Sequence, residues 1–277
     1  MPEVEVNGTT LFYERVGSGL PCIALHGGLG FDHTYLRRSF GPLEDVIEFI
    51  YVDQRGNGRS GRPPLETITM QQLADDVGAF ARAIGLERFA LLGHSFGGFV
   101  ALEFATTHPE RLTHLFLLDT SPGAFEPTDA ELGERPDPST VDPAAREGVQ
   151  KMFGELPGSD DEFTARIPEI VPAYLHRLEP APLLATMADT IVDTKTLVRG
   201  FEFLPQWSVA EKLGRITCPA LVTCGRYDLL TTPECSKRLS TAIPHATLAW
   251  FEEAGHFPWI EEPDAFFAAV KSFVARN

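Results

Sequence analysis

The 277-residue sequence predicts an α/β protein with an eight-stranded, mostly parallel sheet, flanking helices and a helical segment inserted as a cap. Three observations favour this fold class. Short apolar runs alternate with amphipathic helical patterns, as in repeated strand–helix units. Runs such as residues 49–52 are continuously apolar, which is typical of strands that helices cover on both faces. One run leads through Gly93-His94-Ser95-Phe96-Gly97-Gly98 directly into a helical pattern.

The first two predicted strands flank Asn7-Gly8, a strong turn signal, and are expected to form an antiparallel hairpin. The remaining strands are expected to be mainly parallel, because helical patterns separate them. In chain order, the predicted strands cover residues 3–7, 10–16, 21–26, 47–52, 88–93, 114–119, 219–224 and 246–251.

Helical patterns fill the intervals between the later strands. One helix is expected to begin at Thr69, which forms a capping box with Gln72, and to end at Gly85. A second follows Ser95 and ends near Pro109, and the last begins near Pro263. The first of these helices has an apolar face at helical spacing, made of Leu73, Val77, Phe80 and Ile84.

Residues 122–206 break this alternation. They hold 11 of the 22 prolines, and their helical patterns have no strand signal between them. An unstructured loop of this length is improbable in a compact domain. We therefore expect a core of residues 1–121 and 207–277, with a cap over 122–206 that shapes a pocket and excludes water. The expected cap helices cover about 143–154, 161–179 and 183–199.

Composition limits the classes of partner. A net charge of −16 argues against nucleic acid and anionic membranes, since both would repel the protein. No stretch approaches the roughly 20 apolar residues of a membrane span, and residues 1–6 lack the features of a signal peptide. The cysteines form no C-x-x-C pair, so we expect reduced thiols in a cytoplasmic protein. The sequence carries no signal for an oligomeric state.

The strand–serine–helix corner puts Ser95 in the position of a nucleophile. Gly93 and Gly97 lie two positions on either side of it, where a Cβ would collide across so sharp a turn. The serine must then adopt a strained backbone conformation, which proteins maintain mainly where the strain is useful. Here the strain would hold Oγ clear of the backbone, above the sheet and at a helix N-terminus.

A serine nucleophile needs a base within reach and a carboxylate that orients the base. His256 follows the last predicted strand and so shares the carboxyl edge of the sheet with Ser95. Asp228 follows the preceding strand and is the expected acid, with Asp119 at the end of another strand as the alternative. The resulting chain order is nucleophile, acid and base.

Acyl transfer also needs N–H donors for the oxyanion. Phe96 offers one donor, because its N–H opens the helix after Ser95. Gly28, in the loop His26-Gly27-Gly28-Leu29-Gly30, is the expected second donor, with Leu29 as the alternative. His26 is expected to shape this loop by hydrogen bonding.

Residues 52–60 follow another strand and contain two glycines spaced G-x-G. A phosphate site is not expected, because a third glycine and a G-K-[ST] motif are missing. Asp53 and Arg55 are instead expected to lock a turn that supports the oxyanion loop, and His94 to fix the corner by a hydrogen bond. The remaining histidines have no role assigned from sequence: His33, His108, His114, His176 and His245.

Taken together, Ser95 within Gly-His-Ser-Phe-Gly-Gly, Asp228 and His256 resemble the α/β-hydrolase fold superfamily over essentially the whole core. The combination is specific, since three motifs follow three strands in the right order. The resemblance implies the α/β-hydrolase fold and hydrolytic chemistry.

A narrower resemblance is to the proline iminopeptidase-like branch of that superfamily. The branch typically has proline where Leu29 stands. At the positions of His94 and Phe96, this chain looks more like esterases, lactonases and carbon–carbon bond hydrolases. The segments similar to the iminopeptidase branch are residues 26–30 with 33–36, and residues 53–60.

The iminopeptidase resemblance also implies cap carboxylates that hold a free amine, for which the candidates are Glu126, Glu179 and Glu202. Phe257 and Trp259, which follow the proposed base, are further candidates for the substrate pocket.

The leading hypothesis is a serine hydrolase, without metal or cofactor, that cleaves a small ester, lactone or amide through an acyl-enzyme. The alternative is release of N-terminal proline from short peptides. A cofactor-free perhydrolase or haloperoxidase would use the same triad. A hypothesis from another class is a non-catalytic small-molecule receptor on this fold, against which the complete triad argues.

Overall fold

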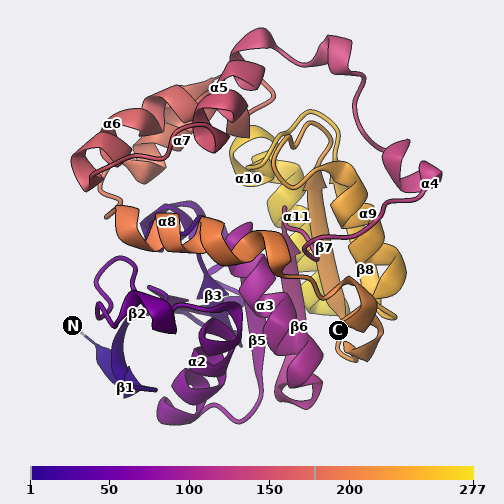
Figure 1. The fold of residues 1–277 in the computed structure, drawn as a ribbon. Helices are drawn as coiled ribbons and strands as arrows, with labels where there is room; N and C mark the ends of the chain where they lie inside the picture. The colour runs from indigo at the N-terminus through magenta and orange to yellow at the C-terminus, as the bar shows by residue number, and fades with distance from the viewer. Residues whose placement is uncertain (1, 178) are drawn as a thin grey trace.

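The computed structural model describes residues 2–177 and 179–277. Its centre is one eight-stranded sheet in the order β1-β2-β4-β3-β5-β6-β7-β8, in which β1 and β2 pair antiparallel, as do β2 and β4. All other neighbours are parallel (Figure 1). The fold class predicted from sequence is therefore confirmed. The strands are β1 Glu3–Val6, β2 Thr9–Gly17, β3 Leu20–Leu25, β4 Ile47–Val52, β5 Phe89–His94, β6 Leu112–Leu118, β7 Ala220–Gly225 and β8 Ala246–Phe251.

Every predicted strand is present, with ends that differ by two residues or fewer. The turn between β1 and β2 has positive φ at Asn7 (44°) and Gly8 (76°), the conformation that this dipeptide favours. The strand predicted over 114–119 ends at Leu118, because Asp119 has a φ of 44° and leaves the extended region.

Helices cover both faces of the sheet. Side chains alternate between these faces along β3, where Ile23 and Leu25 pack with α2, α3 and α9. Cys22 and Ala24 pack with α1 and α11 on the opposite face. The sequence analysis did not predict α1 or α9. In chain order, the helices of the described residues are α1 Thr34–Ser39, α2 Met70–Ala83, α3 Phe96–Thr107, α4 Asp129–Leu132, α5 Pro143–Phe153, α6 Asp160–Ile170, α7 Pro180–Met187, α8 Thr194–Phe203, α9 Pro233–Ala242, α10 Pro258–Glu261 and α11 Pro263–Arg276.

The segment between β6 and β7 contains α4 to α8, and no strand among its described residues. In Figure 1, α5, α6 and α7 gather above the sheet, whereas α4 lies apart from them beside α9. The prediction of one helix over 161–179 is wrong. The helix ends at Ile170, and a 3₁₀ turn over Val171–Tyr174 follows it, because Pro172 lacks the N–H that a continued helix needs. Position 178 lies outside the described residues.

The helix predicted over 183–199 is also divided in two. α7 ends at Met187, and α8 begins after Asp193, whose side chain accepts the N–H of Thr196 at 2.7 Å. An N-cap of this kind starts a new helix. The capping box predicted at Thr69 is only half formed, because Gln72 donates to the Asp76 carboxylate (3.0 Å) instead of returning to the Thr69 backbone.

One buried ion pair joins the loop after β4 to α2 and to the β1–β2 turn. Arg55, 2% exposed, donates two hydrogen bonds to Asp76, at 2.6 and 2.8 Å. Its other contacts are with the carbonyl of Asn7 (3.2 Å) and the hydroxyl of Thr67 (3.1 Å). The pair is charge-assisted and bidentate, so its geometry fixes the direction of the loop.

No helix of the described chain is both long enough and apolar enough to cross a membrane. The four cysteines are buried, and each is a free thiol.

We predict that Asp76→Ala lowers the free energy of unfolding by about 3–5 kcal/mol, because it leaves a buried guanidinium without its carboxylate. Urea denaturation followed by circular dichroism measures this change. Asp75→Ala is the matched control, because Asp75 is exposed on the same helix. We expect it to change the free energy by less than about 0.5 kcal/mol. Equal effects of the two substitutions would show that the buried pair does not stabilise the fold.

A second ion pair attaches α4 to α9 and predicts a pH dependence. Arg238 donates to Glu131 at 2.6 and 2.9 Å and lowers the pKa of this carboxyl to about 2 from an ordinary value of 4.5. Because the folded pKa is the lower one, the ion pair stabilises the fold above about pH 4.5, and its contribution disappears as pH falls through 2. The difference in free energy of unfolding between wild type and Glu131→Gln should therefore shrink from pH 7 to pH 3. In an Arg238→Gln background, the effect of Glu131→Gln should depend much less on pH, and an unchanged dependence would contradict the assignment.

Candidate active site

Ser95 lies at the corner where β5 turns into α3. Its backbone has φ 52° and ψ −121°, a conformation that residues other than glycine rarely adopt. A Cβ on Gly93 would lie 2.3 Å from the carbonyl oxygen of Gly97, and a Cβ on Gly97 would lie 2.3 Å from that of Leu25. Only glycine at these positions lets the three backbone segments approach so closely. The corner leaves Ser95 half-buried in the wall of a cavity.

His256 and Asp228 form a buried hydrogen-bonded pair in the loops after β8 and β7. His256 Nδ1 donates to Asp228 Oδ2 at 2.8 Å. The carboxylate also accepts the N–H of Leu230 (2.8 Å) and, from Thr231, both the N–H (3.1 Å) and the hydroxyl (2.8 Å). Burial raises the pKa of Asp228, but the charge of His256 and these donors outweigh burial and hold the pKa below its ordinary value. The ionised carboxylate fixes the proton on Nδ1 and leaves Nε2 free to accept one.

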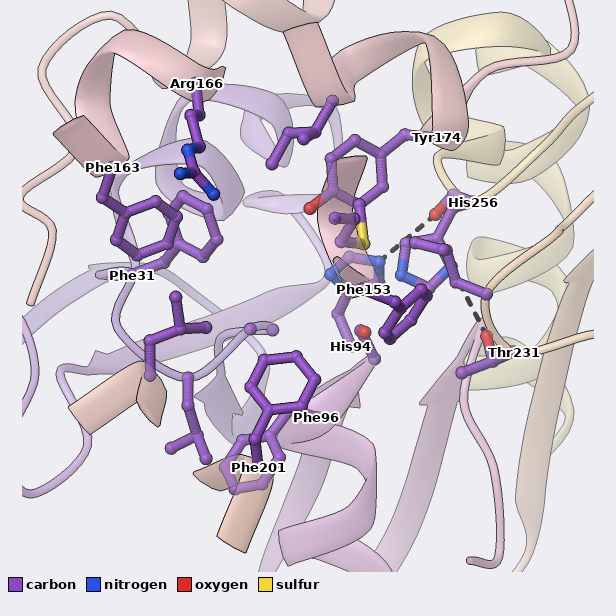
Figure 2. Close-up of a pocket in the computed structure, with 18 of the residues that line it drawn as sticks. Phe31, His94, Phe96, Phe153, Phe163, Arg166, Tyr174, Phe201, Thr231 and His256 are labelled. Atoms are coloured by element: carbon purple, nitrogen blue, oxygen red, sulfur yellow. Dashed lines mark hydrogen bonds between the residues drawn. The ribbon is translucent and has the colours of Figure 1, made fainter. Parts of the chain in front are cut away.

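The structure brings Ser95 and His256 to the same cavity, with Asp228 behind the imidazole. Figure 2 shows His256 between Tyr174 and Thr231 at one side of this cavity. No hydrogen bond joins Ser95 Oγ to His256 within the described residues. Such bonds are often long in hydrolases without substrate. The two groups are thus arranged as a nucleophile and its base would be.

Asp119, the alternative acid, lies in a different environment. Its carboxylate accepts the N–H of Gly225 (2.8 Å) and the hydroxyl of Thr223 (2.9 Å), and its recorded partners do not include His256. Burial and the nearby charge of Asp228 raise the pKa of Asp119 well above its ordinary value. This geometry favours Asp228 as the orienting carboxylate and gives Asp119 the role of joining the ends of β6 and β7.

The proposed oxyanion donors lie on two sides of Ser95. Gly28, Leu29 and Phe96 all line the cavity, and the N–H of Phe96 is at the first position of α3. Gly28 has a φ of 59°, and a Cβ there would lie 2.3 Å from the ring of Phe31. The loop can therefore adopt this conformation only with glycine at position 28.

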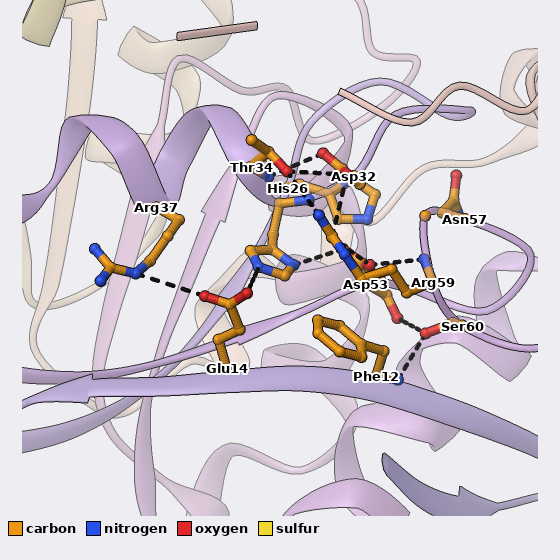
Figure 3. A network of polar contacts seen from close by, with 12 residues as sticks. Phe12, Glu14, His26, Asp32, Thr34, Arg37, Asp53, Asn57, Arg59 and Ser60 are labelled. Carbon is orange, nitrogen blue, oxygen red and sulfur yellow. Dashed lines mark hydrogen bonds and ion pairs between the residues drawn. The ribbon is translucent and has the colours of Figure 1, made fainter. Parts of the chain in front are cut away.

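A network of polar contacts supports this loop from below (Figure 3). The N–H of Gln54 donates to His26 Nε2 (3.1 Å), and the Gln54 side chain donates to the His26 carbonyl (2.9 Å). Asp53 accepts hydrogen bonds from the backbone N–H (3.0 Å) and from Nδ1 (2.5 Å) of His33, a histidine left unassigned from sequence. Asn57 accepts the N–H of Gly30 at 2.7 Å. Residues 53–57 thus hold both ends of the loop that carries Gly28.

The cavity beside Ser95 has a volume of about 200 Å³ and is lined mainly by apolar and aromatic side chains. Figure 2 shows Phe31 and Phe163 on one side and Phe96 and Phe201 on another. Two cations, Lys151 and Arg166, are also among the lining residues; Lys151 pairs with two glutamates of the cap and Arg166 with one. The lining from the cap is Lys151, Met152, Phe153, Pro157, Phe163, Arg166, Ile170, Tyr174, Met187, Leu197, Phe201 and Leu204.

Four of the five pocket candidates lie elsewhere. Glu126, Glu179 and Glu202 are exposed and do not line the cavity, and Glu202 pairs with Arg199 at 2.7 Å. These carboxylate side chains stay in water, where their charge is solvated. Trp259 is 2% exposed and packs in the core against Phe40 and Phe266, whereas Phe257 does line the cavity.

The cap contacts the loop of the proposed base directly, which the sequence did not reveal. The N–H of His256 donates to the carbonyl of Tyr174 at 2.7 Å. Glu261 accepts the N–H groups of His176 and Arg177, both at 2.8 Å, and that of Gly255 at 2.7 Å. One carboxylate thereby joins the cap to the loop of the proposed base. Its sequence signal, an acidic residue in the first turn of α10, is too common to single it out.

Among the described residues, no group of three or more His, Cys, Asp or Glu side chains is arranged to hold a metal ion. Thr231, which binds the Asp228 carboxylate, is a further site residue that sequence reasoning missed. Its only local signal is its position three residues after that aspartate.

Comparison with known proteins agrees with this geometry. Residues 21–263 match the family model described as alpha/beta hydrolase fold. A proline iminopeptidase of Pestalotiopsis fici is 30% identical, with 99% of each chain covered. An esterase of Thermogutta terrifontis, of known structure, is 26% identical with a TM-score of 0.76, covering 100% of this chain and 99% of its own. An enol-lactonase of Burkholderia xenovorans, 24% identical with a TM-score of 0.75 and 99% and 100% covered, shares the fold. This chain therefore belongs to the alpha/beta-hydrolase fold family and is a hydrolase.

Proposed function

We propose that the protein is a serine hydrolase that cleaves a small, mainly apolar carboxylic ester or lactone through an acyl-enzyme on Ser95. One observation carries this proposal: the strained Ser95 and His256, which is hydrogen-bonded to Asp228, line the same apolar cavity. Phe96 and Gly28 face the same cavity with backbone N–H groups suited to an oxyanion.

In the proposed mechanism, Ser95 Oγ attacks the substrate carbonyl carbon while His256 Nε2 takes its proton. Asp228 stabilises the imidazolium that forms. The N–H groups of Phe96 and Gly28 (or Leu29) stabilise the oxyanion of the tetrahedral intermediate. His256 then protonates the leaving group. In the second half of the reaction, His256 activates a water molecule that hydrolyses the acyl-enzyme and restores the Ser95 hydroxyl.

The lining of the cavity supports an uncharged acyl group. Its aromatic side chains would bury apolar surface, at roughly 25 cal/mol per Å². The second candidate, release of N-terminal proline, is favoured by the 30% identical relative named proline iminopeptidase. That reaction requires a cationic amine in the pocket. No Asp or Glu is present among the described residues that line the cavity, and an ammonium buried without a partner is costly.

We predict that Ser95→Ala lowers turnover of p-nitrophenyl esters by on the order of 10⁶-fold, because the nucleophile of a cooperating triad is lost. A fluorophosphonate probe, followed by mass spectrometry, should label the wild type at Ser95 and leave the variant unlabelled. Ser240→Ala is the matched control, since its hydroxyl is on α9 and binds only the carbonyl of Lys237. A folded wild type without labelling at Ser95 would instead favour a non-catalytic receptor.

A second prediction separates the two hydrolytic reactions. The wild type should hydrolyse p-nitrophenyl butyrate, and its kcat/KM for L-proline p-nitroanilide should be no higher than that for the N-acetylated proline anilide, because no carboxylate is present among the described residues that line the cavity. The other substrates to be compared are p-nitrophenyl acetate and γ-butyrolactone. Preference for the free amine, lost in Glu126→Gln, Glu179→Gln or Glu202→Gln, would establish the iminopeptidase reaction instead.

A further inference from the structure

A chain of three buried hydrogen bonds runs from the oxyanion loop to the loop of the proposed base. The N–H of Gly27 lies 2.6 Å from Tyr35 Oη, and Tyr35 Oη lies 2.6 Å from His94 Nδ1. His94 Nε2 lies 3.2 Å from the carbonyl oxygen of His256 (dashed in Figure 2). Tyr35, His94 and His256 are each 3% exposed or less.

The two ends of this hydrogen-bond chain and the neutral state of His94 together set the direction of its bonds. A backbone N–H can only donate, so Tyr35 Oη accepts from Gly27. A carbonyl oxygen can only accept, so His94 Nε2 carries the proton that bonds to His256. Because burial keeps His94 neutral, its Nδ1 has no proton and accepts the hydrogen bond of the Tyr35 hydroxyl.

The surroundings keep both side chains in these protonation states. Burial, together with the charge of His256, lowers the pKa of His94 well below its ordinary value. Burial also raises the pKa of the Tyr35 phenol, which stays a hydrogen-bond donor. The rings of His256, Phe257 and Trp259 lie with centroids 4.8 to 4.9 Å from that of His94 and prevent it from rotating.

His94 holds the peptide group that follows His256, while the cap holds the one that precedes it. The carbonyl of His256 accepts from His94, and its N–H donates to the carbonyl of Tyr174. At the other end of the chain, a Cβ on Gly27 would lie 2.8 Å from His94 Nδ1 and 3.0 Å from Tyr35 Oη. The oxyanion loop can thus approach this pair only because residue 27 is glycine.

We propose that Tyr35 and His94 are positioning residues that set the separation between the oxyanion donors and the base His256. This inference rests on the proposed function, because it assigns roles relative to Ser95 catalysis. Displacing either loop would misalign the base and the oxyanion donors, and an error near 1 Å can cost about 100-fold in rate.

Tyr35→Phe tests the proposal, since it removes one hydroxyl and keeps the ring. We expect kcat for p-nitrophenyl butyrate, and the rate of fluorophosphonate labelling, to fall by about 10- to 100-fold, with KM changed by less than about threefold. Tyr51→Phe is the matched control, because Tyr51 is fully buried and its hydroxyl has no partner among the described residues. It should leave kcat unchanged.

His94→Phe and the double variant Tyr35→Phe/His94→Phe supply a second test. If the two residues act through one chain of hydrogen bonds, the double variant should lose no more activity than the more impaired single variant. His94→Gln should recover part of the rate lost in His94→Phe, because an amide can accept from Tyr35 and donate to His256. Multiplicative losses, or no recovery by glutamine, would overturn the proposal.

Histidine ¹⁵N NMR reports the protonation state of each ring nitrogen of His94 without any substrate. In the wild type, His94 should keep its only ring proton on Nε2 from pH 5.5 to 8.5. In Tyr35→Phe this proton should stay on Nε2, because the His256 carbonyl can only accept, but the Nδ1 resonance should shift, since Nδ1 loses the Tyr35 hydroxyl as its donor. A wild-type His94 protonated on Nδ1 would overturn the inference, as would unchanged kcat and labelling in Tyr35→Phe. By contrast, a folded wild type that is not labelled at Ser95 would overturn the proposed function itself.

Discussion

The steric constraint at the β5–α3 corner sets the position of Ser95 relative to the loop that carries Gly28. Ser95 has a positive φ, and Gly93 and Gly97 let α3 begin in contact with the backbone at the end of β3. That contact brings the loop with Gly28 beside Ser95. A Cβ at either glycine would separate β5, α3 and β3, and Ser95 would no longer lie beside the loop that carries Gly28.

Polar contacts between loops turn this shared edge into a defined site. Asp53 and Gln54 fix the oxyanion loop from below, and Asp228 fixes the tautomer of His256 from behind. Glu261 joins the same loop to the cap. Because Asp53, Gln54 and Asp228 are buried, their hydrogen bonds are strong and an unpaired member would be costly, so the loops are held in one arrangement.

Core and cap have separate tasks in this arrangement. The core carries the proposed catalytic groups, since Ser95, Asp228 and His256 all follow strands of the sheet. The cap supplies much of the cavity wall, including Phe163 and Phe201. None of the described cap residues that line the cavity is an aspartate or a glutamate. Relatives with this fold can therefore share the chemistry and differ in substrate, as their names as esterase, enol-lactonase and proline iminopeptidase indicate.

The strands and the residues at their ends were predictable from the sequence alone. Continuous apolar runs mark buried parallel strands, and parallel order brings Ser95, Asp228 and His256 to one edge. Other features required the tertiary structure. The contacts of Glu261 with the cap and with Gly255, and the contact of His94 with the carbonyl of His256, join segments that lie apart in the chain. Local periodicity carries no information on such contacts, so the sequence determined the chemistry and the packing of the cap determined the cavity.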